Sequence, residues 1–140
     1  ETIDVDPRHL KSVTDAMALV TAAPAGTAHA ARIMTPGMSM GGKTGTAQVR
    51  RITQRERDGG VIKNKDLPWR YRDHALFVGY GPVEAPRYAI AVVVEHGGGG
   101  SAVAAPIARD VMTQTLKRDP ARLAPGANVA GLRAPGSQGG

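Results

Sequence analysis

The residues best suited to chemistry are four consecutive ones, Lys43, Thr44, Gly45 and Thr46. They open a segment, residues 43–52, that is rich in β-branched side chains and free of proline, which predicts a strand. Along a strand Lys43 and Thr44 point to opposite sides, and Gly45 leaves room for another backbone to lie against it. The ammonium group and the threonine hydroxyls would form a receptor for a carboxylate. A backbone amide at the same edge can point at a developing oxyanion.

The same lysine also completes a pattern typical of phosphate-binding loops. Residues 37–44 read Gly-Met-Ser-Met-Gly-Gly-Lys-Thr, which matches GxxxxGK[ST]. In a nucleotide-binding ATPase, the backbone amides of such a loop surround the phosphates, Lys43 reaches the outer phosphates and Thr44 binds Mg²⁺. This hypothesis needs a strand before the loop and a helix that begins at Lys43, whereas Gly45 and Thr46 are poor residues for a first helical turn. It stays open as an alternative.

Composition excludes several other chemistries. The chain of 140 residues has no cysteine, which rules out a thiol nucleophile, a disulfide framework and thiolate metal ligands. Its four histidines lie far apart without metal-ligand spacing, so we expect no metal site. No apolar run reaches the roughly 18 residues of a membrane-spanning helix. The formal net charge of +6 favours anionic partners, but an aromatic content of 4% offers few stacking platforms for nucleic acid, so we expect no nucleic-acid partner.

Two segments have helical periodicity. The first begins at Asp6 and Pro7, a typical cap and first helical residue, and stops at the Pro-Ala-Gly of residues 24–26. The second follows the glycines of residues 97–100, with Ser101 as the expected cap. We expect each helix to bury an apolar stripe, formed by Leu10, Val13, Met17 and Val20 in the first and by Val103, Ile107, Val111 and Leu116 in the second.

The remaining segments complete an α+β pattern. Residues 74–80 and 88–95 are apolar and flank a turn, which predicts a β-hairpin, and the second is apolar on both faces and so is expected to be covered on both sides. Residues 55–69 are polar and predict a long exposed loop. The order helix, strand, hairpin, helix predicts an antiparallel sheet flanked by helices over residues 1–118. Residues 119–140, dominated by proline, glycine and alanine, predict a disordered tail.

Several blocks, in order along the chain, resemble class B penicillin-binding proteins. Residues 43–49 read KTGTAQV, the form that the third motif of these serine acyltransferases takes. Residues 73–82 are similar to the strand that follows it, of the form D-H-A-x-F-x-G-[FY]-A-P. The Asp-His opening of this strand and the later Glu-His-Gly-Gly favour the elongation-type subgroup, penicillin-binding protein 2. Further similar blocks are the helix and GTA turn at residues 17–20 and 26–28, and the last strand, glycine turn and final helix at residues 91–98 and 104–108.

The resemblance implies a peptidoglycan D,D-transpeptidase that cross-links stem peptides during cell-wall elongation. In that family a serine attacks the D-Ala-D-Ala end of a stem peptide, and β-lactams imitate this substrate. By the resemblance, Lys43 would assist proton transfer near a second serine and attract the substrate carboxylate, which the hydroxyls of Thr44 and Thr46 would bind. The backbone N–H of Thr46 would complete the oxyanion hole, with Gly45 beside it in the substrate-binding strand. No metal or organic cofactor is implied.

The same resemblance places the nucleophile outside these 140 residues. The family's first two motifs are SxxK and SxN, and neither begins at Ser12, Ser39, Ser101 or Ser137. We therefore expect the C-terminal part of a transpeptidase domain, inactive without its nucleophile and activating base. The parent enzyme would face the periplasm from an inner-membrane anchor, with the rest of its own chain and the cell-elongation machinery, including a membrane glycosyltransferase, as partners. A catalytically inactive penicillin-recognising domain is a further alternative.

Overall fold

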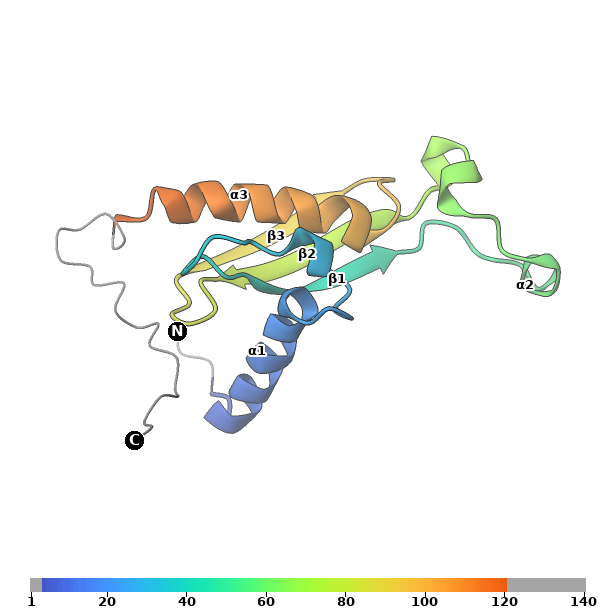
Figure 1. Ribbon diagram of the computed structural model, residues 1–140. Coiled ribbons are helices and arrows are strands. Elements are labelled where there is room, and N and C mark those ends of the chain that lie inside the picture. The colour runs from blue at the N-terminus through green and yellow to red at the C-terminus, as the bar shows by residue number, and fades with distance from the viewer. Residues whose placement is uncertain (1–3, 121–140) are drawn as a thin grey trace, which may run out of the picture.

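The computed structural model describes residues 4–120, which form one antiparallel sheet between two helices (Figure 1). Strand order is β1-β2-β3, with α1 on one face and α3 on the other. The predicted α+β fold is confirmed. The helices and strands are α1 (Pro7–Ala22), β1 (Gly41–Ala47), α2 (Gln54–Gly59), β2 (His74–Gly81), β3 (Tyr88–Val94) and α3 (Ala105–Lys117), with short turns η1 (His29–Ala31), η2 (Asn64–Asp66), η3 (Trp69–Tyr71) and η4 (Gly100–Ala104).

Strand β1 begins at Gly41, slightly before the predicted segment 43–52. It ends at Ala47, well before the predicted end, and is therefore shorter than predicted. Ala47 pairs with His74, the first residue of β2, so no partner strand remains for the residues beyond it. The beginning of the strand is glycine because aromatic rings fill the space beside it. A methyl group on Gly41 would lie 2.9 Å from the Tyr80 ring.

The hydrophobic core lies between the sheet and α3. Phe77 is fully buried, whereas Ile107 and Val111 are 43% and 49% exposed. The predicted stripe is therefore wrong at Ile107 and Val111, whereas Leu116 is buried and Val103 is half-buried against the core. Alanine side chains let the helix approach the sheet closely, so the helix buries Ala105, Ala108, Met112 and Leu116.

The start of α3 also differs from the expectation. Ser101 does not cap a helix, because it lies inside the π-helical turn η4, which leads directly into α3. The backbone N–H groups of Ala102 and Val103 donate to the carbonyl of Gly99 at 3.2 and 3.1 Å. The helix thus begins from a glycine turn rather than from a side-chain cap.

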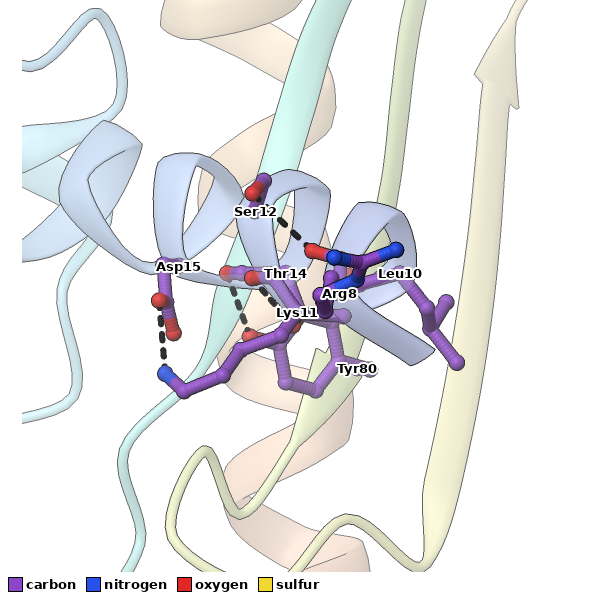
Figure 2. Close-up of polar contacts among 7 residues, drawn as sticks. All are labelled: Arg8, Leu10, Lys11, Ser12, Thr14, Asp15 and Tyr80. Atoms are coloured by element: carbon purple, nitrogen blue, oxygen red, sulfur yellow. Dashed lines mark hydrogen bonds and ion pairs between the residues drawn. The ribbon is translucent and has the colours of Figure 1, made fainter. Parts of the chain in front are cut away.

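Helix α1 begins as predicted, with Asp6 accepting a hydrogen bond from the backbone N–H of Arg8 at 2.8 Å. Its contact with the sheet is polar, because the Tyr80 hydroxyl donates to the carbonyl of Thr14 at 2.8 Å. Figure 2 shows this contact beside the exposed ion pair of Lys11 and Asp15. Burial, together with the charges of Asp15 and Glu84, raises the pKa of Tyr80, which keeps its donating proton in place.

The predicted apolar stripe of α1 is only partly buried. Leu10 and Val13 are 56% and 57% exposed, whereas Met17 and Val20 are half-buried. Thr21, one of the few buried polar residues, donates its hydroxyl to the carbonyl of Met40. The helix therefore contacts the rest of the fold through Val20, which packs against the core, and through the hydrogen bonds of Thr14 and Thr21.

The predicted hairpin is confirmed as β2 and β3, joined through a cis Gly81–Pro82 peptide bond. The expectation that the second strand is covered on both sides is wrong. As the outer strand farthest from α1, β3 alternates between half-buried and exposed residues, and Val93 is 63% exposed.

The segment predicted as a long loop, residues 55–69, contains most of α2 and all of η2 and ends where η3 begins, although most of it is exposed as expected. Helix α2 is stabilised by a capping box in which the N–H of Glu56 donates to the Thr53 hydroxyl at 3.3 Å and the Thr53 N–H donates to the Glu56 carboxylate at 3.1 Å. These contacts, with the nearby guanidinium of Arg50, lower the pKa of Glu56. The Thr-x-x-Glu spacing is itself a sequence signature of a helix start.

The predicted disordered tail lies almost wholly outside the described residues. Its first residue, Asp119, is buried and accepts a hydrogen bond from Nε of Arg87 at 2.8 Å. Among residues 4–120, none of the helices combines the length and apolar character needed to cross a membrane.

Candidate functional site

The four residues singled out from the sequence occupy the middle and the end of β1, at the outer edge of the sheet. Lys43 and Thr46 are exposed, and Thr44 and Gly45 are half-buried. Because side chains alternate along a strand, the Thr44 and Thr46 side chains share one face, and Lys43 starts on the other. The register places Gly45 beside Leu76. One edge of this strand is paired with β2, and within the described residues the other edge has no strand partner.

The lysine stays close to the strand. Its Nζ donates to the carbonyl of Thr44 at 2.7 Å. A carbonyl oxygen carries only partial negative charge, so this contact leaves the positive charge of Lys43 available to an anion. The arrangement is suited to attracting a carboxylate along an exposed strand edge.

The structure adds Thr27 to the site. Its hydroxyl lies 3.1 Å from the hydroxyl of Thr44. Thr27 sits in a tight turn after α1, where the N–H of Ala28 donates to the carbonyl of Val20 at 3.0 Å, and a methyl group on Gly26 would lie 2.3 Å from that carbonyl oxygen. The Gly-Thr-Ala sequence marked this turn as similar to a family block, but no site role had been assigned to Thr27.

The two histidines that bracket the hairpin meet at the end of the sheet where β1 leaves it. The N–H of His96 donates to Nδ1 of His74 at 2.9 Å, and the Nδ1 of His96 lies 3.0 Å from the carbonyl oxygen of Arg72. His74 must therefore carry its proton on Nε2 when neutral. The ring of Trp69 meets the His96 ring edge-on, with centroids 4.4 Å apart. Sequence reasoning identified His74 only as the start of a strand and missed this pairing.

His96 adopts a left-handed backbone conformation, with φ of 55°. Residues other than glycine rarely adopt this backbone conformation, so the contacts around His96 must hold it there. Within residues 4–120 the structure contains no group of three or more His, Cys, Asp or Glu side chains that could hold a metal ion.

The geometry rejects the phosphate-binding alternative. That motif requires a helix to begin at the lysine. Here Lys43 and Thr44 are in the interior of a strand, and the next helix along the chain, α2, begins at Gln54. The backbone amides of residues 41–47 are therefore arranged as in a sheet rather than as a phosphate cradle.

Comparison with known proteins gives a consistent result. The family model for the penicillin binding protein transpeptidase domain matches residues 1–113. The peptidoglycan D,D-transpeptidase MrdA of Acinetobacter baumannii is 42% identical over 95 residues, which cover 66% of this chain and 13% of that protein. The MrdA of Haemophilus influenzae is 40% identical over 77 residues, or 55% of this chain and 11% of that protein. The chain thus spans about one eighth of the length of the curated relatives it matches.

Solved structures show the same relationship. A complex between PBP2 and MreC from Helicobacter pylori aligns with a TM-score of 0.64 and 27% identity, over 81% of this chain and 18% of the other. The structure of Pseudomonas aeruginosa PBP2 in complex with WCK 5153 aligns with a TM-score of 0.61 and 35% identity, over 83% and 21%.

Proposed function

This chain belongs to the penicillin-binding protein transpeptidase domain family, with its relatives among the PBP2-type members, and we propose that it supplies one wall of the acyl-transfer site of an elongation-type peptidoglycan D,D-transpeptidase. One observation carries the proposal: the Lys-Thr-Gly-Thr segment forms an outer strand, and its second edge has no strand partner among residues 4–120. An extended peptide can add to such an edge through backbone hydrogen bonds.

The substrate is a stem peptide that ends in D-Ala-D-Ala. Its backbone lies along β1, where Gly45 presents no side chain to the ligand. The terminal carboxylate lies against the hydroxyls of Thr44 and Thr46 and is attracted by the ammonium of Lys43. The contact between Thr27 and Thr44 holds the Thr44 hydroxyl oxygen near the strand edge, which reduces the entropy lost on binding.

The chemistry requires a serine from elsewhere in the protein. Its Oγ attacks the carbonyl carbon of the penultimate D-Ala, the peptide bond to the terminal D-Ala breaks, and an ester to the serine remains. The negative charge on the carbonyl oxygen is stabilised by the backbone N–H of Thr46 together with the serine's own N–H. The amine of a neighbouring stem peptide then attacks the ester and forms the cross-link. Lys43 assists proton transfer during these steps, and no metal or organic cofactor takes part.

The proposal extends to the whole protein. The whole protein faces the periplasm from an inner-membrane anchor and is acylated by β-lactams. It acts in cell-shape maintenance together with the elongation machinery, which includes a membrane glycosyltransferase. The H. pylori PBP2 that aligns with this chain was solved with MreC, which supports a partner of that kind.

A fluorescent penicillin tests the proposal on the full-length protein. We expect covalent labelling that unlabelled β-lactam prevents and ATP does not. Replacing the serine of an SxxK motif elsewhere in the protein by alanine should abolish the labelling. An intact protein with SxxK and SxN motifs that is not labelled would overturn the proposal. If the rest of the protein lacks SxxK, the chain belongs instead to an inactive penicillin-recognising domain.

A further inference from the structure

The Lys-Thr-Gly strand is supported from behind by a glycine turn at residues 97–100. A methyl group on Gly100 would lie 2.3 Å from the carbonyl oxygens of both Gly45 and Leu76, and 2.9 Å from the backbone nitrogen of Gly45. These distances are far below an ordinary contact, so Gly100 touches the backbone of β1 directly. The opposite side of Gly45 faces Leu76, whose Cβ would be 3.3 Å from a methyl group on Gly45. Gly45 is therefore held between β2 and this turn.

The turn is fixed by hydrogen bonds to the start of β2. The N–H of His96 donates to Nδ1 of His74 at 2.9 Å, and the N–H of Gly98 donates to the carbonyl of Asp73 at 2.8 Å. The Nδ1 of His96 also lies 3.0 Å from the carbonyl oxygen of Arg72. The turn cannot retreat from β1 without breaking these contacts.

We propose that Gly100 is a positioning residue for the oxyanion hole, with the contact between His74 and His96 setting the position of its turn. This inference rests on the proposed function, because the backbone N–H concerned is that of Thr46, the neighbour of Gly45. Oxyanion donors act within a range of a few tenths of an ångström. Relieving a 2.3 Å contact to the 3.4 Å of an ordinary one moves the strand by roughly 1 Å, and a displacement of that size can cost about 100-fold in rate.

The chain provides a matched control one residue away. A methyl group on Gly99 would meet nothing within 4 Å, and Gly99 has an extended backbone, with φ of −91° and ψ of 132°, that alanine adopts readily. Gly99→Ala and Gly100→Ala therefore add the same atoms to the same turn, but only the second presses on the Lys-Thr-Gly strand.

The experiment measures acylation of the full-length protein by a fluorescent penicillin, recording both the rate constant and the final labelled fraction. We expect Gly100→Ala to lower the rate constant about 100-fold while the labelled fraction still reaches that of the unmodified protein. Gly99→Ala should keep the original rate. A purely structural role would instead lower the labelled fraction and leave the rate of the remaining folded molecules unchanged. An unchanged rate in Gly100→Ala, or equal effects of the two variants, would overturn the inference.

If Gly100→Ala does not fold, a second pair of variants, at His74, tests the same inference. His74→Leu removes the acceptor for the N–H of His96, whereas His74→Asn retains an oxygen close to the position of Nδ1. We expect His74→Leu to slow acylation roughly threefold to tenfold at full final labelling, and His74→Asn to recover most of the rate. Equal rates in both variants would contradict the inference. An unmodified protein that is not labelled at all would instead refute the proposed function.

Discussion

The hydroxyl of Thr46 provides the sharpest test of substrate recognition. Thr46 is exposed at the end of β1, and its hydroxyl has no hydrogen-bond partner among residues 4–120. Thr46→Val keeps the β-branched shape and the backbone N–H but removes this hydroxyl. The folded protein without substrate loses little, because an exposed substitution of this kind changes stability by less than about 0.5 kcal/mol.

The expected effect arises when a carboxylate binds. A hydrogen bond to a charged group contributes about 1.5–3 kcal/mol, and we take the lower end because Thr46 is solvent-exposed. Acylation by a penicillin should therefore slow about tenfold. Thr44→Val should have a larger effect, because it also removes the 3.1 Å contact with Thr27.

The assay compares a penicillin carrying the free carboxylate with its methyl ester, using the full-length protein. For Thr46→Val the rate should fall with the carboxylate and change little with the ester. The ester is the internal control, because it retains the reacting ring and loses only the charge. Equal slowing with both compounds would refute the carboxylate role of Thr46 and indicate a shifted backbone instead.

Three further predictions concern the scaffold. Met112→Ala should destabilise the protein by about 2–4 kcal/mol, measured as a lower midpoint of thermal unfolding, because this side chain is fully buried. Tyr80→Phe should cost about 1 kcal/mol in the same measurement, since it removes the hydrogen bond to the Thr14 carbonyl. The lowered pKa of Glu56 means that its contribution to the helix cap is present above the ordinary glutamate pKa of about 4.3 and is lost as the pH falls through the lowered value. The amide resonance of Thr53 should report this loss in an NMR titration, and a resonance unchanged down to pH 2 would contradict it.

Sequence patterns predicted the positions of the helices and strands better than they predicted which face of each helix is buried. Periodicity identified both long helices, but it gave equal weight to every large apolar residue, and so it missed that α3 buries alanines while Ile107 and Val111 remain exposed. Which face of a helix is buried depends on the neighbouring element, and this information is not local. The end of β1 shows the same dependence, because it is set by the first residue of β2 rather than by the propensity of residues 48–52.

Sequence patterns likewise predicted only part of the candidate site. The Lys-Thr-Gly-Thr segment is contiguous, so a motif reveals it. The contacts between Thr27 and Thr44 and between His74 and His96 join residues 17 and 22 positions apart, and only the folded chain brings them together. The capping box of α2 was also missed, because residues 55–69 were predicted as a loop, although its Thr-x-x-Glu spacing is local and readable in the sequence.

The glycines at the start of β1 link this strand to its neighbours in a way that bears on how the sequence can vary over evolution. Tyr80 fills the space beside Gly41, and a methyl group on Gly42 would lie 2.2 Å from the ring of Phe77. Gly41 cannot acquire a side chain unless the Tyr80 ring shrinks. Gly42 cannot acquire one without a backbone shift, because its methyl group would also lie 2.6 Å from the carbonyl oxygen of Val78. A substitution at Gly41 is therefore tolerated only together with a smaller residue at position 80, whereas any substitution at Gly42 must move the strand itself.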